Sequence, residues 1–167
     1  FSIQAARAAG AAKIIAIGLS ADGDRFEMAK HHGATDIIMS DKVNLRDEIM
    51  RITNGQGVAV VADAAGVNPV LTQAIDICRP TGKIVKIGYD ARPYGASLDD
   101  LVGKAVALNG HFGYDYVSWR CVFNLVEAGK WDNKTIISHK LPLSEWRQAI
   151  DLYRNRESMK VLLYPED

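Results

Sequence analysis

The chain has 167 residues, 48% hydrophobic and 24% charged, which is ordinary for a soluble globular domain with a sizeable core. Lysine plus arginine equals aspartate plus glutamate at 20 each, so charge gives no reason to expect nucleic acid or an acidic membrane as a partner. No apolar run approaches the roughly 18 residues of a membrane span, so we expect none.

Two features of the chain bear on its compartment and its start. Cys78 and Cys121 lie in segments of helical pattern without CxxC spacing, so we expect ordinary buried thiols in a reducing compartment, the cytoplasm. Phe1 opens an Ala-rich helical pattern without the charged and apolar regions of a signal peptide. We therefore expect a chain that starts inside a structural element.

The first half of the chain alternates helical periodicity with short apolar runs. Gly10 and Gly33 follow the last periodic residues of two helices, while Asp24 and Asn68-Pro69 suit helix starts. The expected helices are 1–10, 24–33, 44–53 and 68–78, and the expected strands are 13–18, 36–39, 58–63 and 83–88, with Pro80-Thr81-Gly82 as a turn.

The second half begins with a loop over residues 90–97 that contains proline and glycine. After it the pattern predicts fewer strands. The expected elements are helices over 98–103, 118–128 and 144–154, strands over 105–112 and 161–164, and an extended or irregular segment over 131–141.

The stretch from Val58 to Gly66 is the most apolar strand candidate, with three valines before Asp63 and Gly66. Such a strand is typical of the centre of a parallel sheet that helices cover on both faces. The alternation of strands and helices through residue 129 predicts a doubly wound α/β fold, in which ligands bind beyond the carboxyl ends of the strands.

The strand ends share glycine or small residues, which suit a flat, extended ligand close to the backbone. The four ends are Gly18-Leu19-Ser20, Ala64-Ala65-Gly66, Ile87-Gly88-Tyr89 and Phe112-Gly113. Asp63 can cap the loop that follows it or lie near a ligand, and we favour the cap.

Several stretches resemble the cofactor domain of medium-chain, zinc-type alcohol dehydrogenases, nearest to the sorbitol and threonine dehydrogenase branch. They are residues 5–15, residues 27–30 followed by 33–36, residues 54–57, residues 79–83, and residues 137–143 followed by Trp146. The resemblance covers nearly the whole chain. It implies a Rossmann-like doubly wound parallel sheet over residues 1–136, and a returning segment over 137–167 that packs on a catalytic domain.

This chain departs from the family's pattern at the start of the domain. No GxGxxG is present, because Gly55 and Gly57 are followed by Val60 and precede a strand. The family's Gly-rich loop precedes the helix that opens this chain, so the sheet is expected to be truncated at its first strand. The zinc ligands and proton relay belong to the family's preceding catalytic domain, so we expect no metal ligands here.

The resemblance implies an enzyme that transfers hydride between a secondary alcohol or polyol and NAD or NADP. Zinc would act in the complete enzyme, and we expect the isolated chain to be inactive. Two alternatives stay open: a zinc-free quinone oxidoreductase of the same superfamily, and a non-catalytic nucleotide-binding module. Family members commonly pair subunits through the last strand of this sheet, here 105–112, so we expect a homo-oligomer.

The resemblance also assigns cofactor contacts at the strand ends. Gly18 stands where NAD enzymes carry an acidic residue for the adenosine ribose. We therefore expect tolerance of NADP, with Ser20 and Arg25 near the 2′-phosphate; Arg25 is equally well explained as a solvated helix-start residue. Backbone contacts are expected from Ala64, Ala65 and Gly66, and contacts to the nicotinamide from Ile87, Gly88, Tyr89 and Phe112.

The four histidines do not form a metal motif in the sequence. His31 and His32 are expected at a helix C-terminus, where a cation suits the helix dipole. His111 and His139 lie far apart in the sequence, without cysteine or carboxylate partners at ligand spacing.

Overall fold

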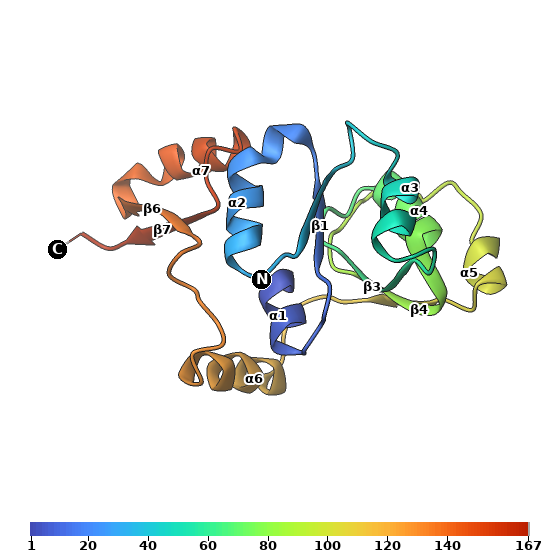
Figure 1. Cartoon of the computed structure of the whole chain (residues 1–167). Helices are drawn as coiled ribbons and strands as arrows, with labels where there is room; N and C mark the ends of the chain where they lie inside the picture. The colour runs from blue at the N-terminus through green and yellow to red at the C-terminus, as the bar shows by residue number, and fades with distance from the viewer. Residues whose placement is uncertain (167) are drawn as a thin grey trace. The chain divides into compact units, whose positions relative to one another are not determined.

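A computed structural model describes residues 1–166 (Figure 1). It contains helices and strands that alternate along the chain. The helices are α1 (Ser2–Ala8), α2 (Gly23–His31), α3 (Leu45–Ile52), α4 (Asn68–Ile77), α5 (Asp99–Gly103), α6 (Tyr116–Glu127) and α7 (Trp146–Arg154), with short 3₁₀ turns at Ser20–Asp22 and Leu143–Glu145. The strands are β1 (Ile15–Gly18), β2 (Asp36–Met39), β3 (Val58–Asp63), β4 (Cys78–Lys86), β5 (Ala107–Gly110), β6 (Ile137–Pro142) and β7 (Lys160–Tyr164).

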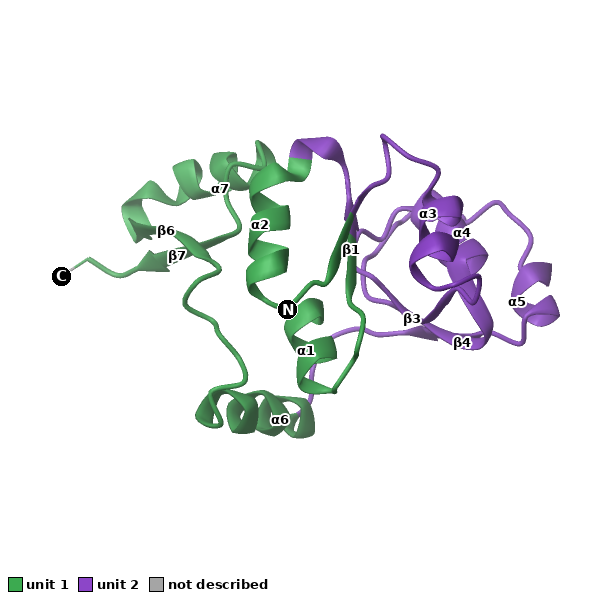
Figure 2. Cartoon of the chain, viewed as in Figure 1, with its two compact units in different colours: residues 1–16, 22–37, 116–167 green, residues 17–21, 38–115 purple. Residues whose placement is uncertain are grey.

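The chain divides into two compact units (Figure 2). Unit 1 comprises residues 1–16, 22–37 and 116–167, and unit 2 comprises residues 17–21 and 38–115. This division does not test the expected boundary between residues 136 and 137, which stays a prediction.

Unit 2 is built on a parallel sheet in the order β3-β4-β5. Its core lies between this sheet and α4, because the apolar positions of α4 recur at helical spacing. The core residues are Leu71, Ala74, Ile75, Cys78, Ile84 and Val106, with Val61, Tyr94 and Leu101 packed against them.

The expectation that β3 is buried on both faces at the centre of a sheet is wrong for this chain. Among the described residues β3 is an edge strand, paired with β4 only. Val61 packs on the core, whereas Val60, on the opposite face, is 60% exposed. Successive side chains of a strand point to opposite faces, so a core on one side leaves the valines of the other face uncovered.

The neighbouring strands also differ in detail from the sequence-based expectation. β4 begins at Cys78, and the expected turn lies inside the strand, with Thr81 at φ 57° and a shift of register opposite Val58–Val60. β5 covers only Ala107–Gly110, and it starts later than expected because Ala105 adopts φ 50°, which an extended strand does not allow.

Unit 1 contains the parallel pair β6-β7, on which α7 packs. The segment 131–141, expected to be extended or irregular, is extended in its second part, since the regular strand β6 begins at Ile137. α2 begins at Gly23, so Asp24 lies in its first turn and does not cap it. The expected helix ends are confirmed, because Gly10 and Gly33 take φ +84° and +110° just beyond α1 and α2.

β1 pairs with β2 and forms a sheet separate from β3-β4-β5 in the described part of the chain. The amide of Thr35 donates to the carbonyl of Ile14, and the amide of Ser40 donates to that of Gly18 at 2.9 Å. The later residue of one strand therefore pairs with the later residue of the other, so β1 and β2 run parallel. This places the loop after β2 beside the end of β1.

Two expectations about environment have different outcomes. Cys78 is buried as expected, and burial raises the pKa of its thiol, whereas Cys121 is exposed, contrary to expectation. Over residues 1–166, no helix is long and apolar enough to cross a membrane.

Candidate cofactor-binding rim

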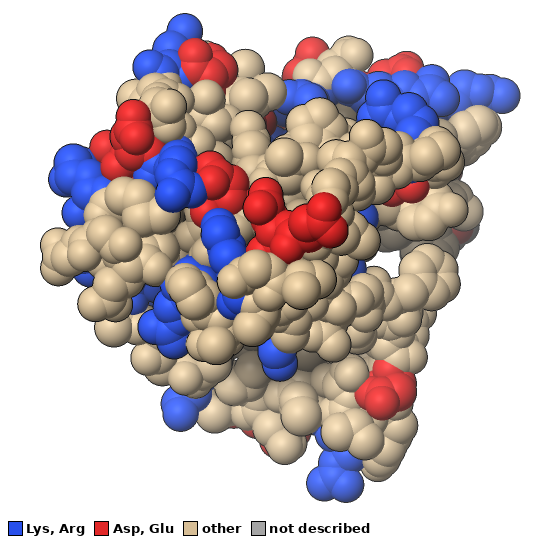
Figure 3. Space-filling view, turned by 90° about the vertical axis from the view of Figure 1, so that its right-hand side faces the viewer, with Lys and Arg blue, Asp and Glu red and all other residues tan. Residues whose placement is uncertain are grey.

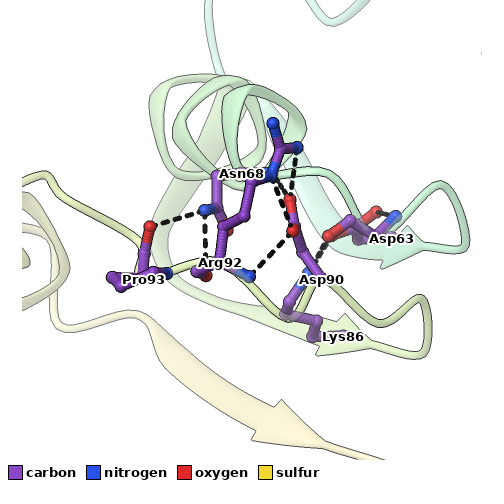
Figure 4. A network of polar contacts seen from close by, with 7 residues as sticks. Asp63, Asn68, Lys86, Asp90, Arg92 and Pro93 are labelled. Carbon is purple, nitrogen blue, oxygen red and sulfur yellow. Dashed lines mark hydrogen bonds and ion pairs between the residues drawn. The ribbon is translucent and has the colours of Figure 1, made fainter.

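The loop after β3 is fixed by a buried carboxylate (Figure 4). Asp63, 2% exposed, accepts a hydrogen bond from the amide of Gly66 at 2.8 Å. The ammonium group of Lys86 donates to Asp63 at 3.1 Å and to the carbonyl of Gly66 at 2.8 Å. This is the expected loop-capping role of Asp63, with a lysine of β4 as its counter-charge.

The loops after β3 and β4 touch through two glycines. A Cβ atom on Gly66 would lie 2.5 Å from the backbone of both Gly88 and Tyr89, and one on Gly88 would lie 2.3 Å from the nitrogen of Gly66. Side chains do not fit at either position. In this structure the small residues therefore serve the approach of one loop to the other.

A second polar network joins the start of α4 to the loop after β4 (Figure 4). The side-chain amide of Asn68 donates to the carbonyls of Arg92 and Pro93, at 3.2 and 2.8 Å. Asp90 accepts from the guanidinium of Arg92 and from the backbone amide of Asn68. The hydrogen bond from Arg92 holds the pKa of Asp90 far below its usual range. The rim over β3 and β4 is thus a pre-formed framework.

The end of β1 carries a carboxylate that comes from the neighbouring loop. Asp41, two residues beyond β2, accepts hydrogen bonds from the amide of Ser20 at 2.7 Å and from its hydroxyl at 2.5 Å. The hydroxyl bond is the main reason that the pKa of Asp41 is lowered. Gly18 itself accepts from the amide and hydroxyl of Ser40.

The structure brings some predicted site residues together and not others. Ala65 and Gly66 meet Gly88 and Tyr89 at the contact of the two loops, and Ala64 and Ile87 are their neighbours in the chain. Gly18, Leu19 and Ser20 lie at the end of β1, in a different sheet. The guanidinium of Arg25 donates to the carbonyl of Ser158 at 3.0 Å. Phe112 is 99% exposed, beyond the end of β5.

Sequence reasoning missed Asp41, Lys86, Asn68, Asp90 and Arg92. Asp41 lies just past a predicted strand, so the rule that polar groups gather at strand ends would have found it. Lys86 follows Ile84 and Val85 in an apolar strand, which signals a buried partner of opposite charge. The network of Asn68, Asp90 and Arg92 joins segments that are distant in the sequence, so no local sequence pattern predicts it.

A hollow of about 210 Å³ lies in unit 1, separate in its residues from the rim. It is lined by Gln4, Arg7, His31, His32, Gly129, Lys130, Trp131 and Asp132. Arg7 and His31 lie in the last turns of α1 and α2, where basic side chains compensate the helix dipoles, so we assign the hollow no ligand.

Two further observations concern charged and metal-binding side chains. Lysine and arginine are interspersed with aspartate and glutamate on the face in Figure 3. Within residues 1–166, no group of three or more His, Cys, Asp or Glu side chains is placed to hold a metal ion.

The fold is α/β with parallel sheets and loops gathered at the carboxyl ends of strands, an arrangement that defines a class of nucleotide-binding domains. Within that class, the chain belongs to the zinc-binding dehydrogenase family, whose model matches residues 1–128. The expected α/β fold and the stated resemblance are confirmed.

Relatives and a solved structure match almost the whole chain. An uncharacterized zinc-type alcohol dehydrogenase-like protein of Escherichia coli is 32% identical over 98% of this chain and 46% of its own length. A sorbitol dehydrogenase of Halalkalibacterium halodurans is 30% identical over 98% of this chain and 48% of its own length. Alcohol dehydrogenase TADH from Thermus sp. ATN1 superposes with a TM-score of 0.89 at 28% identity, covering 99% of this chain and 47% of its own. The chain spans just under half the length of these proteins.

Proposed function

We propose that this chain is the nicotinamide-dinucleotide-binding part of a zinc-dependent alcohol or polyol dehydrogenase. The observation that supports this most directly is the alignment of almost the whole chain with just under half of the length of such dehydrogenases. The enzyme would transfer hydride between a secondary alcohol and NAD or NADP in the cytoplasm. The nicotinamide supplies hydride acceptance when the cofactor is bound.

The residues of the rim fit parts of a dinucleotide. We propose that Gly18, Leu19 and Ser20 contact the adenosine half. The loops held by Asp63 and Lys86 would present Ala64, Ala65, Gly66, Ile87, Gly88 and Tyr89 to the nicotinamide half, and Phe112 is a further candidate there. The exposed ring of Tyr89 has room for a ligand, since it is 84% exposed. Their role is to position the cofactor.

Zinc and the pyrophosphate are not accounted for by residues 1–166. These residues contain no cluster of side chains that could bind zinc. We therefore propose zinc-assisted polarisation of an alcohol only for the catalytic domain that precedes this part in the family. The pyrophosphate needs backbone amides at a helix N-terminus after a Gly-rich loop, and this sequence contains no GxGxxG. We therefore propose that this chain alone is inactive.

Sequencing the coding DNA around the codon for Phe1 separates the candidate functions. A zinc-dependent dehydrogenase predicts an upstream reading frame with a Cys, His and Glu ligand set followed by a Gly-rich loop. A Gly-rich loop without the ligand set indicates a quinone oxidoreductase, and the lack of both indicates a non-catalytic module. The complete product is then tested with NAD, NADP and a panel of secondary alcohols and polyols; turnover of none of them contradicts the proposal.

A further inference from the structure

The two side chains expected to receive a 2′-phosphate both have other partners. The hydroxyl of Ser20 donates to a carboxylate oxygen of Asp41, and the guanidinium of Arg25 donates to the carbonyl of Ser158. A carboxylate thus stands where the sequence, with Gly18 at the end of β1, predicts none. The expectation that the site tolerates NADP depended on there being no carboxylate at the end of β1.

The carboxylate of Asp41 is held in a fixed place. The amide and the hydroxyl of Ser20 contact different oxygens of Asp41, at 2.7 and 2.5 Å, so the carboxylate cannot rotate freely. The side chain of Asp41 remains 34% exposed, and each oxygen keeps a lone pair for another donor. An aspartate is ionised at neutral pH, and the hydrogen bonds from Ser20 lower the pKa of Asp41 further.

Lys42 is a cation close enough to compensate part of the negative charge of Asp41. The ammonium of Lys42 is 3.8 Å from Asp41, but it sits on a flexible and mostly exposed side chain. A solvated ammonium screens a neighbouring carboxylate only weakly. The fixed charge at the end of β1 is therefore negative.

We propose that Asp41, positioned by Ser20, takes the place of the missing acidic residue at position 18 and makes the site select NAD over NADP. This rests on the proposed cofactor function. An ionised carboxylate accepts hydrogen bonds from the two hydroxyls of an adenosine ribose. It repels a 2′-phosphate, which is doubly charged and offers no donor when ionised.

The test compares Asp41→Asn with the unchanged protein in the complete product of the reading frame. Asparagine keeps both contacts to Ser20, because its amide oxygen accepts and its amide nitrogen donates, but it removes the charge. We expect the ratio of kcat/KM with NAD to that with NADP to fall about tenfold or more. Asp47→Asn removes an exposed charge in the first turn of α3 and serves as the control; its ratio should stay unchanged.

A second measurement uses the 167-residue chain itself and needs no catalysis. Adenosine 5′-monophosphate and adenosine 2′-monophosphate are titrated while NMR shifts of Ser20 and Asp41 are followed. The 5′ nucleotide should bind more tightly than the 2′ nucleotide, with a Kd in about the millimolar range. Asp41→Asn should reduce the difference between the two Kd values. Equal affinities, no saturable shift at these residues, or an unchanged cofactor ratio in Asp41→Asn would overturn the inference. Absence of turnover with both cofactors in the unchanged complete protein would instead contradict the proposed function.

Discussion

Gly66 is the residue whose replacement should be most damaging to the rim. It combines φ +81° with backbone of the neighbouring loop at 2.5 Å from any Cβ. We expect Gly66→Ala to destabilise the chain by about 2 kcal/mol or more, because both the backbone strain and the clash oppose folding. Urea unfolding followed by circular dichroism measures the change.

Gly55 provides the matched control for this substitution. It has nearly the same φ, +80°, but nothing lies within 4 Å of the position of a Cβ. Gly55→Ala should therefore cost only the strain, about 1 kcal/mol. Equal losses in the two variants would mean that the contact between the loops contributes nothing.

His32 should make the stability of unit 1 depend on pH. Burial lowers its pKa from 6.5, and the charge of His31 and of the Phe1 amine lowers it further, whereas Asp132 opposes this. A folded-state pKa below the unfolded value means that the contribution of neutral His32 to stability is fully present above about pH 6.5. This contribution is lost as the pH falls from there through the folded-state pKa. The melting temperature should therefore drop between about pH 7.5 and about pH 5.5.

The variant that tests this pH dependence is His32→Gln, which cannot gain a proton. The fall in its melting temperature over the same range should be smaller by about 1–2 °C than that of the unchanged chain. His139→Gln on β6 serves as the control for the same substitution elsewhere in unit 1. An identical pH profile in His32→Gln and the unchanged chain would show that His32 carries none of the effect.

At the scale of elements, Lys86 links β4 to the loop after β3. Its replacement by methionine keeps the length of the side chain but leaves the buried carboxylate of Asp63 without its cation. We expect a loss of about 2 kcal/mol, since an unpaired buried charge costs more than a lost surface ion pair. Lys83→Met, at an exposed position of the same strand, is the control and should change stability little. If both variants melt alike, the buried pair does not stabilise the loop.

Element positions were largely predictable from the sequence, because helices end in local signals. Gly10, Gly33 and Asn68-Pro69 marked helix boundaries that the structure contains, and Asp63 took the predicted capping role. The environment of each element was less predictable. Nothing in the run of valines in β3 reveals that only one face would be covered, since a strand's burial depends on neighbours distant in the sequence.

The candidate site was predictable only where it follows from chain order. Strand ends with small residues are visible in the sequence, and Gly66 and Gly88 do meet in space. The pairing of Ser20 with Asp41 was not foreseen, because it depends on which strand lies beside β1. Sequence spacing gives the residues at each strand end, but the adjacency of strands decides which of them act together.

At the scale of the whole molecule, β5 should mediate association. All four residues of Ala107–Gly110 are exposed, and β5 is an edge strand of its sheet in the described residues. Pairing with a second copy would satisfy its free backbone groups. We expect a dimer or tetramer of the complete protein, and Leu108→Lys should shift it towards monomer in light scattering at micromolar concentration. Val102→Lys, on the exposed side of α5, should leave assembly unchanged. A monomer before any substitution would refute the prediction.

The last prediction concerns the dinucleotide affinity of these 167 residues alone. In the family's strand order, 3-2-1-4-5-6, a first strand lies between the counterparts of β1 and β3. Here β1 and β3 belong to separate sheets, so each has an edge whose N–H and C=O groups have no strand partner among the described residues. Each such group costs about 1–3 kcal/mol if it is buried, against a total stability of about 5–15 kcal/mol for a domain.

Direct pairing of β1 with β3 would have removed these free edges, and the structure does not contain it. The sequence also contains no GxGxxG whose amides would bind the pyrophosphate. The pair of Ser20 and Asp41, which we propose to bind the adenosine end, and the loops after β3 and β4 are formed, but neither supplies such amides for the pyrophosphate. We therefore expect NAD and NADP to bind this chain more weakly than about micromolar, with no dehydrogenase activity. Calorimetric titration of the chain measures this, with the complete reading-frame product as the positive control; micromolar binding by the chain alone would mean that it holds the pyrophosphate without a Gly-rich loop.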